Sequence, residues 1–98
     1  EMLRNLIVVV RKELSEELER MHGAIAIADA STVARAAHKL HGTVGYFGIA
    51  RIKQTLIRLE RLAKVQEIGA CEELVFQLKT QWRSVDSQLE ESLLRLAE

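Results

Sequence analysis

The sequence predicts an all-α protein, an antiparallel up-down four-helix bundle with a shorter N-terminal helix packed on it. Apolar residues recur at helical spacing along almost all of the 98 residues. The segments between these apolar stripes are only a few residues long, which makes consecutive helices antiparallel. Aromatic residues are 4% of the chain and proline is absent. The core must therefore be aliphatic, a composition that favours helices over a β-sandwich.

The N-terminal third of the chain carries two apolar stripes. The first consists of Leu3, Leu6, Ile7, Val10 and Leu14, and the second of Leu18, Met21, Ile25 and Ala28. Between them, Ser15 is a good N-cap residue and is followed by glutamates that favour a helix N-terminus. We expect a kink or a new helix at Ser15. One unbroken helix from Met2 to Ala28 is the alternative.

The second helix of the bundle is expected after the segment "DAST", in which Asp29 or Ser31 supplies the N-cap. Its apolar stripe consists of Val33, Ala37, Leu40, Val44 and Phe47. Gly48 is expected to end this helix, because glycine commonly occupies the position just past a helix C-terminus.

Two further helices complete the predicted bundle. One runs from Ile49 to about Gln66, with a stripe formed by Ile49, Ile52, Leu56, Leu59 and Ala63. Gly69 is expected to break the chain again, and Glu72 and Glu73 to open the last helix. The stripe of that helix consists of Leu74, Leu78, Trp82, Val85, Leu89, Leu93 and Leu96.

Composition and charge argue against several classes of function. Lys plus Arg and Asp plus Glu number 14 each, whereas a nucleic-acid-binding protein usually carries a basic surplus, so we expect no nucleic-acid partner. The single cysteine, Cys71, excludes an internal disulfide and a multi-cysteine metal site. The longest apolar run, residues 6–10, is too short to span a bilayer, and no signal peptide is evident. We expect one cytoplasmic domain over residues 1–98, without direct membrane contact.

The segment "AAHKLHGTVGYFG", residues 36–48, contains a face of histidines and glycines. At about 100° per residue, His38, His41, Gly42 and Gly45 fall within roughly 60° of one another on a helix. His38 lies off the apolar stripe and is therefore expected to face solvent. Glycine costs about 1 kcal/mol relative to alanine inside a helix, but it leaves the surface beside His38 bare. Such a surface would let another molecule approach an exposed imidazole closely.

Positive charge surrounds this face. Arg35 and Lys39 lie beside His38, and His41 follows one turn later. These groups would suit an anion such as a phosphoryl group. Two other interpretations remain: a solvated histidine without a role, or a metal site formed by His38 and His41, which lacks a defined third ligand. His22 has no supporting motif.

The same segment resembles the signature of histidine phosphotransfer (HPt) domains. That signature is a histidine followed by leucine two residues later, a basic residue three later, and glycines four and ten later. The corresponding residues here are His38, Leu40, His41, Gly42 and Gly48. The form "HKLHG" is most similar to the C-terminal HPt domains of BarA/GacS-type hybrid sensor histidine kinases. Most of the family has lysine where His41 stands, and a histidine is only partly protonated near neutral pH, so its contribution to phosphate binding is left open.

The resemblance implies a phosphorelay. His38 would accept a phosphoryl group on Nε2 from a receiver-domain aspartate and pass it to the aspartate of another receiver. Its Nδ1 needs an acceptor that fixes the tautomer, and the matching position is Glu60. His41 and Lys39 would assist at the phosphoryl group. Receiver docking would use the N-terminal helix and the surface formed by Arg35, Gly42, Gly45, Tyr46 and Ile49.

The resemblance also implies no cofactor or metal in this chain, because the receiver supplies Mg²⁺. The sequence has no P-loop, no GxGxxG and no paired acidic cluster, so autonomous catalysis is not expected. The isolated domain is expected to be a monomer, either free-standing or the cytoplasmic end of an inner-membrane kinase. The alternative function is a helical interaction or dimerisation module without chemistry, whose largest exposed apolar patch would lie away from His38.

Overall fold

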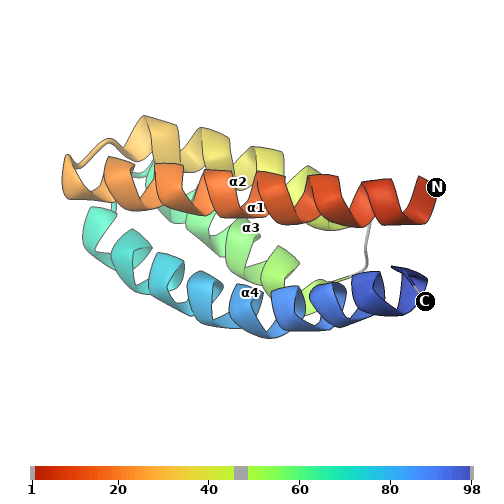
Figure 1. Ribbon diagram of the computed structural model, residues 1–98. Coiled ribbons are helices and arrows are strands. Elements are labelled where there is room, and N and C mark those ends of the chain that lie inside the picture. The colour runs from red at the N-terminus through yellow and green to blue at the C-terminus, as the bar shows by residue number, and fades with distance from the viewer. Residues whose placement is uncertain (1, 46–48, 98) are drawn as a thin grey trace.

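The protein folds into a bundle of four helices in the computed structural model, which describes residues 2–45 and 49–97. The helices are α1 (Met2–Ala26), α2 (Ala30–Gly45), α3 (Ala50–Lys64) and α4 (Ile68–Ala97). Consecutive helices run antiparallel in an elongated molecule (Figure 1), whose principal extents are 46 × 20 × 18 Å. The described residues contain no strand. The predicted all-α four-helix bundle is confirmed.

The four helices form two opposite faces. Helix α1 packs against α2 and α4, and α3 packs against the same two helices, so α1 and α3 lie on a diagonal. One face of the bundle therefore consists of α2 and α3, and the opposite face of α1 and α4. The two long helices, α1 and α4, extend beyond α2 and α3 at the end of the bundle where both termini lie (Figure 1).

The core is aliphatic, as the composition predicts. Fully buried side chains come from every helix, and the largest of them are Leu14, Met21, Leu40, Ile52, Leu56, Leu59 and Leu78. The predicted stripe residues that the structure describes within α2 and α3 are all buried, and Ile49, just before α3, is partly buried. Two further residues are buried that the stripes did not include, Ala36 and Thr55. Burial of such a stripe is the main source of stability for helices of this length.

Helix α1 is continuous, so the expected shorter N-terminal helix is wrong and the single-helix alternative is correct. The helix passes through Ser15, which is exposed, and ends at Ala26 rather than Ala28. Leu14 and Leu18, on either side of Ser15, are both buried in the same core. A serine inside a helix costs only a few tenths of a kcal/mol, which is less than the burial of one leucine contributes.

Helix α2 begins with a side-chain cap. The Asp29 carboxylate accepts hydrogen bonds from the backbone N–H of Thr32 (3.2 Å) and from Thr32 Oγ1 (2.6 Å). Both hydrogen bonds lower the pKa of the Asp29 carboxyl below its usual value, and the bond from the Thr32 hydroxyl has the larger effect. Of the two predicted caps, Asp29 is therefore the one that the structure uses.

Two of the helices are followed by a non-glycine residue in the left-handed backbone conformation. Ala28 (φ 57°) follows α1, and Gln66 (φ 61°) follows α3. After α3, the N–H of Glu67 donates to the carbonyl of Leu62 and the N–H of Gln66 to that of Ala63, the Schellman pattern. The expected break at Gly69 is wrong, because the chain already turns at Gln66 and α4 begins at Ile68.

Ala28→Gly is expected to stabilise the fold by about 1 kcal/mol, because glycine adopts the left-handed conformation without the steric cost of a Cβ. Urea unfolding followed by circular dichroism measures the change. Ala26→Gly, two residues earlier in the right-handed last turn of α1, is the control and should not stabilise. Equal effects of the two substitutions would show that the conformation of Ala28 carries no strain.

Candidate functional site

His38 lies in the middle of α2 with its imidazole directed to solvent. Its side chain is 75% exposed. The adjacent Ala37 is completely buried, as is Leu40 two residues later. The core therefore fixes the rotation of α2, and that rotation presents the His38 ring outward.

Glu60 of α3 lies directly beside this ring. Its Oε2 is 3.1 Å and its Oε1 3.3 Å from His38 Nδ1. A carboxylate only accepts hydrogen bonds, so Nδ1 carries the proton in this contact. In the neutral ring, Nε2 is then unprotonated and free to act as a nucleophile. The structure therefore places Glu60 within hydrogen-bonding distance of His38, as expected.

Glu60 is held as a carboxylate. Its side chain is only 15% exposed, and Lys64 Nζ lies 2.9 Å from Oε2 one turn along α3. Partial burial would raise the pKa of the Glu60 carboxyl, but the hydrogen bonds and positive charges of Lys64 and His38 outweigh it and lower the pKa. The acceptor for Nδ1–H is therefore ionised at neutral pH.

A shallow hollow between α2 and α3 surrounds His38. It is lined by Ala34, Arg35, His38, Lys39, Glu60 and Lys64. Arg35 lines this hollow, and its Nη2 donates to Thr32 Oγ1 (3.3 Å) one turn earlier in α2. Three cationic side chains thus border the imidazole, and an anion beside Nε2 would be attracted to them.

The two predicted surface glycines leave bare backbone on α2. Gly42 and Gly45 are both exposed, and a Cβ added to either would meet nothing within 4 Å. The packing of the chain itself therefore does not require glycine at these positions. Gly42 lies one turn beyond His38 along α2. Tyr46 and Gly48 lie outside the described residues.

Other predicted site residues are placed differently. His41 is partly buried and does not line the hollow that contains His38. Ile49 is partly buried against the core just before α3, so much of its surface faces the protein rather than a docking partner. Lys39 lines the hollow, but its Nζ lies 3.4 Å from Glu17 Oε2 on α1.

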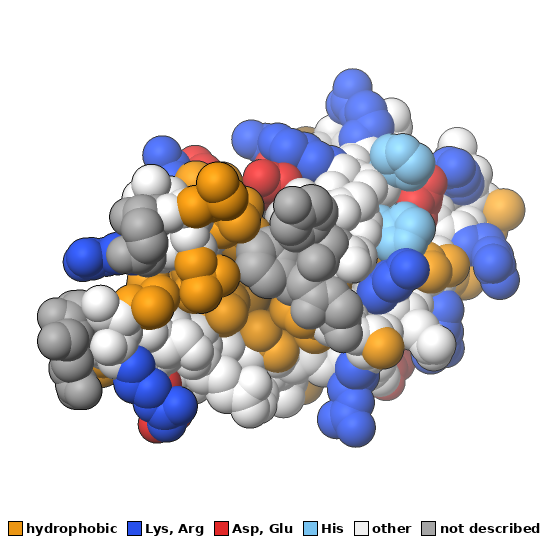
Figure 2. Space-filling model, turned by 90° about the vertical axis from the view of Figure 1, so that its right-hand side faces the viewer, with side chains coloured by type: hydrophobic (Ala, Val, Ile, Leu, Met, Phe, Trp, Pro, Cys, Tyr) orange, Lys and Arg blue, Asp and Glu red, His pale blue; other side chains and the backbone are white. Residues whose placement is uncertain are grey.

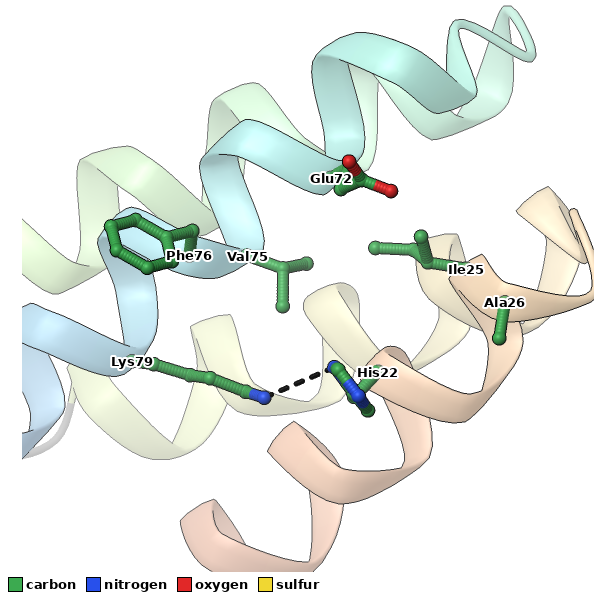
Figure 3. Close-up of a pocket in the computed structure, with 7 residues that line it drawn as sticks. All are labelled: His22, Ile25, Ala26, Glu72, Val75, Phe76 and Lys79. Carbon is green, nitrogen blue, oxygen red and sulfur yellow. Dashed lines mark hydrogen bonds between the residues drawn. The ribbon is translucent and has the colours of Figure 1, made fainter.

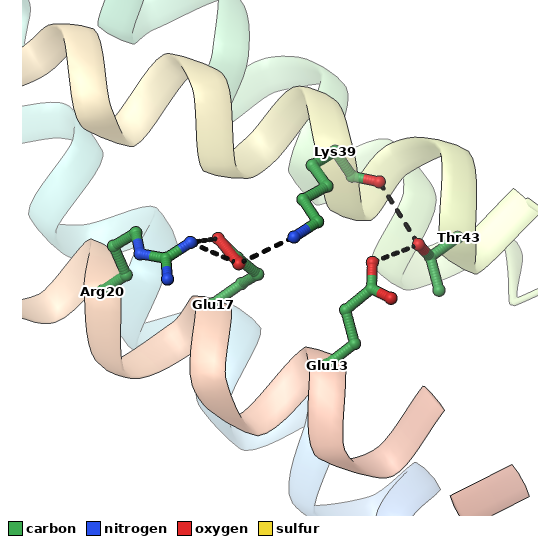
Figure 4. A network of polar contacts seen from close by, with 5 residues as sticks. All are labelled: Glu13, Glu17, Arg20, Lys39 and Thr43. Atoms are coloured by element: carbon green, nitrogen blue, oxygen red, sulfur yellow. Dashed lines mark hydrogen bonds and ion pairs between the residues drawn. The ribbon is translucent and has the colours of Figure 1, made fainter. Parts of the chain in front are cut away.

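Glu17 is a residue that the sequence interpretation missed. Its side chain is only 3% exposed, and it accepts two hydrogen bonds from Arg20 Nη1, of 2.7 and 2.6 Å. Figure 4 shows these contacts together with the neighbouring bond from Thr43 Oγ1 to Glu13. The available signal was its register: Glu17 lies three residues after Leu14 and four before Met21, both on the buried face of α1.

His22 occupies a different hollow, on the opposite α1–α4 face. The hollow is mostly apolar and is lined by His22, Ile25, Ala26, Glu72, Val75, Phe76 and Lys79 (Figure 3). Lys79 Nζ lies 3.1 Å from His22 Nδ1. Because an ammonium only donates, this contact requires an unprotonated Nδ1. The ring of His22 therefore has the opposite arrangement to that of His38, whose Nδ1 donates to a carboxylate.

Exposed hydrophobic side chains gather mainly where α1 and α4 extend past the other helices. They include Met2, Leu3, Val8, Val9, Leu94 and Leu96. Figure 2 shows this end of the molecule, with hydrophobic side chains on one side and histidines among lysines and arginines on the other. None of the six lines the hollow around His38, which is the arrangement that the alternative of an interaction module predicts.

No helix in residues 2–45 or 49–97 is long and apolar enough to cross a membrane. The same residues contain no group of three or more histidine, cysteine, aspartate or glutamate side chains that could hold a metal ion.

Comparisons with known proteins agree with the fold. A family model described as "Hpt domain" matches residues 5–97. The structure is similar to the crystal structure of histidine-containing phosphotransfer protein B (HptB) from Pseudomonas aeruginosa PAO1, with a TM-score of 0.90 and 21% identity. The match covers 94% of this chain and 80% of that one. No curated protein sequence matches the chain. At this identity the structural similarity establishes the fold, and the family model covers nearly all of the sequence.

Proposed function

We propose that His38 is the phosphoryl-accepting residue of this chain, which belongs to the Hpt domain family and has a histidine phosphotransfer role in phosphorelay signalling. The observation that carries the proposal is the contact between His38 Nδ1 and the Glu60 carboxylate on a 75% exposed ring. His22 lacks this arrangement, because its Nδ1 faces an ammonium. We assign residues 1–98 to a single domain.

The contact with Glu60 suits each step of phosphoryl exchange. Nε2 attacks the phosphorus of a receiver's aspartyl phosphate, an N–P bond forms, and the P–O bond to the aspartate carboxylate breaks. The proton stays on Nδ1, so the ring gains positive charge, which the nearby Glu60 carboxylate stabilises. Transfer to the aspartate of a second receiver reverses these steps. Hpt domains pass phosphoryl groups to receiver domains, and the carrier is regenerated unchanged.

The surrounding cations suit the phosphoryl oxygens. Arg35 and Lys64 border the same hollow as His38, and charge-assisted hydrogen bonds from such groups to phosphoryl oxygens are strong. His41 and Lys39 complete the basic surroundings that we propose, although only Lys39 lines the hollow. Mg²⁺ and the catalytic acids are assigned to the receiver, so this chain contributes the nucleophile, its orientation and positive charge.

A receiver is proposed to dock on the exposed surface of α2 around Gly42 and Gly45, with Arg35 at its edge. The "HKLHG" motif at residues 38–42 supports placement among the C-terminal domains of BarA/GacS-type hybrid sensor kinases. On that basis we propose a bacterial, cytoplasmic domain that is monomeric in isolation and is fused to an inner-membrane kinase.

Mapping the phosphorylated atom tests the proposal. The purified chain is incubated with a receiver domain phosphorylated on its aspartate, and the label is located by tandem mass spectrometry at neutral to alkaline pH. An acid-labile phosphoryl group on the peptide that contains His38 is expected, with a ³¹P chemical shift typical of Nε2. A label on His22, on His41 or on no histidine across a panel of receivers would contradict it.

A further inference from the structure

Glu17 is a buried charge whose presence requires an explanation. It lies on the core-facing side of α1, and a carboxylate that is only 3% exposed is costly unless cations and hydrogen bonds compensate it. Two cations do so: Arg20 from the next turn of α1, and Lys39 from α2. Figure 4 shows both side chains converging on the Glu17 carboxylate.

The two cations hold Glu17 unequally. Arg20 Nη1 contacts both carboxylate oxygens, at 2.7 and 2.6 Å, whereas Lys39 Nζ lies 3.4 Å from one of them. Charge-assisted hydrogen bonds between nitrogen and oxygen are usually about 2.7–2.9 Å long, so the lysine contact is the weaker one. The Lys39 side chain is also 57% exposed. Lys39 can therefore leave Glu17 while Arg20 still compensates the carboxylate.

Lys39 borders two hollows on either side of α2. The hollow toward α1 is lined by Glu17, Arg20, Thr32, Arg35, Ala36 and Lys39, and the hollow toward α3 contains His38, Glu60 and Lys64. The flexible four-carbon side chain of lysine allows its ammonium group to reorient between neighbouring anions. Glu17 and a phosphoryl group on His38 would be two such anions.

We propose that Glu17 is a positioning residue that holds Lys39 while His38 is unmodified and releases it to the phosphoryl group once His38 is phosphorylated. The inference rests on the proposed function of His38. A phosphoryl group carries up to two negative charges and lies in the solvent-exposed hollow, whereas Arg20 already neutralises Glu17. Competition between the two anions then sets how tightly the phosphoryl group is held.

A double-mutant cycle on the lifetime of the phosphohistidine tests this inference. Phosphoramidate, a small phosphoryl donor, is used to label His38 without a receiver, and ³¹P NMR follows the loss of the label. Glu17→Gln should lengthen the lifetime about two- to fivefold, the range expected for one partly exposed ion pair. Lys39→Met should shorten it. In the Lys39→Met background, Glu17→Gln should have no effect, because the residue through which it acts is gone.

Two further variants separate positioning from a structural effect. Glu13→Gln is the matched control. Glu13 lies one turn before Glu17 on α1 and also contacts α2, because it accepts a hydrogen bond from Thr43 Oγ1 (2.7 Å). The Glu13→Gln substitution should leave the lifetime of the phosphohistidine unchanged. Arg20→Gln should shorten the lifetime, because Glu17 would then depend on Lys39. Because the Arg20 side chain is 56% exposed, Arg20→Gln should leave the chain folded and can test the inference even if Glu17→Gln unfolds the chain.

The outcomes distinguish this inference from the proposed function. An equal effect of Glu17→Gln in both backgrounds, or a longer lifetime in Arg20→Gln, would overturn the role of Glu17. A chain that phosphoramidate labels on His38 but that no receiver labels would contradict the phosphorelay function, while the cycle could still be measured. Failure of phosphoramidate to label His38 would overturn both.

Discussion

His38→Gln is expected to abolish phosphoryl transfer to this domain without changing its fold. Glutamine has no nucleophilic nitrogen comparable to Nε2, so the acceptor is lost outright, and we expect labelling by a phosphorylated receiver to fall at least about 1000-fold. The imidazole is 75% exposed and makes its hydrogen bond only at the surface of α3. The urea midpoint should therefore change little.

The matched control for this substitution is His22→Gln. His22 is also an exposed helical histidine with one hydrogen-bonding partner, Lys79, but it lies on the opposite face of the bundle. His22→Gln should be labelled at the wild-type rate. Equal labelling of His38→Gln and the wild type would contradict the assignment of the acceptor.

Gly42→Leu is expected to stabilise the helix and yet nearly stop exchange with receivers. Leucine is favoured over glycine in a helix interior by nearly 1 kcal/mol, and nothing lies within 4 Å of the added Cβ. The new side chain would stand on the surface one turn from His38 and keep a receiver away from Nε2. Displacements of about 1 Å can cost 100-fold in rate, so a loss of about 100-fold is expected.

Gly23→Leu on α1 provides the comparison for Gly42→Leu. Gly23 is likewise exposed within a helix, and an added Cβ meets nothing within 4 Å. It does not line the hollow around His38. A similar gain in stability with an unchanged transfer rate is expected. Stopped transfer in both variants, or in neither, would show that the bare backbone at Gly42 does not serve the approach of a receiver.

The fold was predictable because its core follows one rule. Buried residues such as Leu40 and Leu56 recur at helical spacing, and this spacing can be recognised in the sequence without knowledge of the loop conformations. Helix ends were less predictable. Ser15 has the chemistry of an N-cap, but the buried face of α1 continues through it. Ala28 and Gln66 take left-handed conformations that nothing in their residue types indicates.

Only part of the site could be predicted, and its residues were predicted from two different sources. The exposure of His38 followed from its place off the apolar stripe of its own helix. The proximity of Glu60 came from the family resemblance, because the relative rotation of two helices depends on how both pack. The pairing of Lys39 with Glu17 depends in the same way on the packing of α1 against α2. No single-helix pattern contains that information.

The lowered pKa of Glu60 has a consequence for the acid stability of the protein. A carboxyl group whose pKa is lower in the folded than in the unfolded chain stabilises the fold above its unfolded pKa. That contribution is lost as the pH falls through the folded pKa. Mild acidification therefore leaves the carboxylate beside His38 ionised, and only stronger acid removes both its charge and its contribution to the stability of the fold.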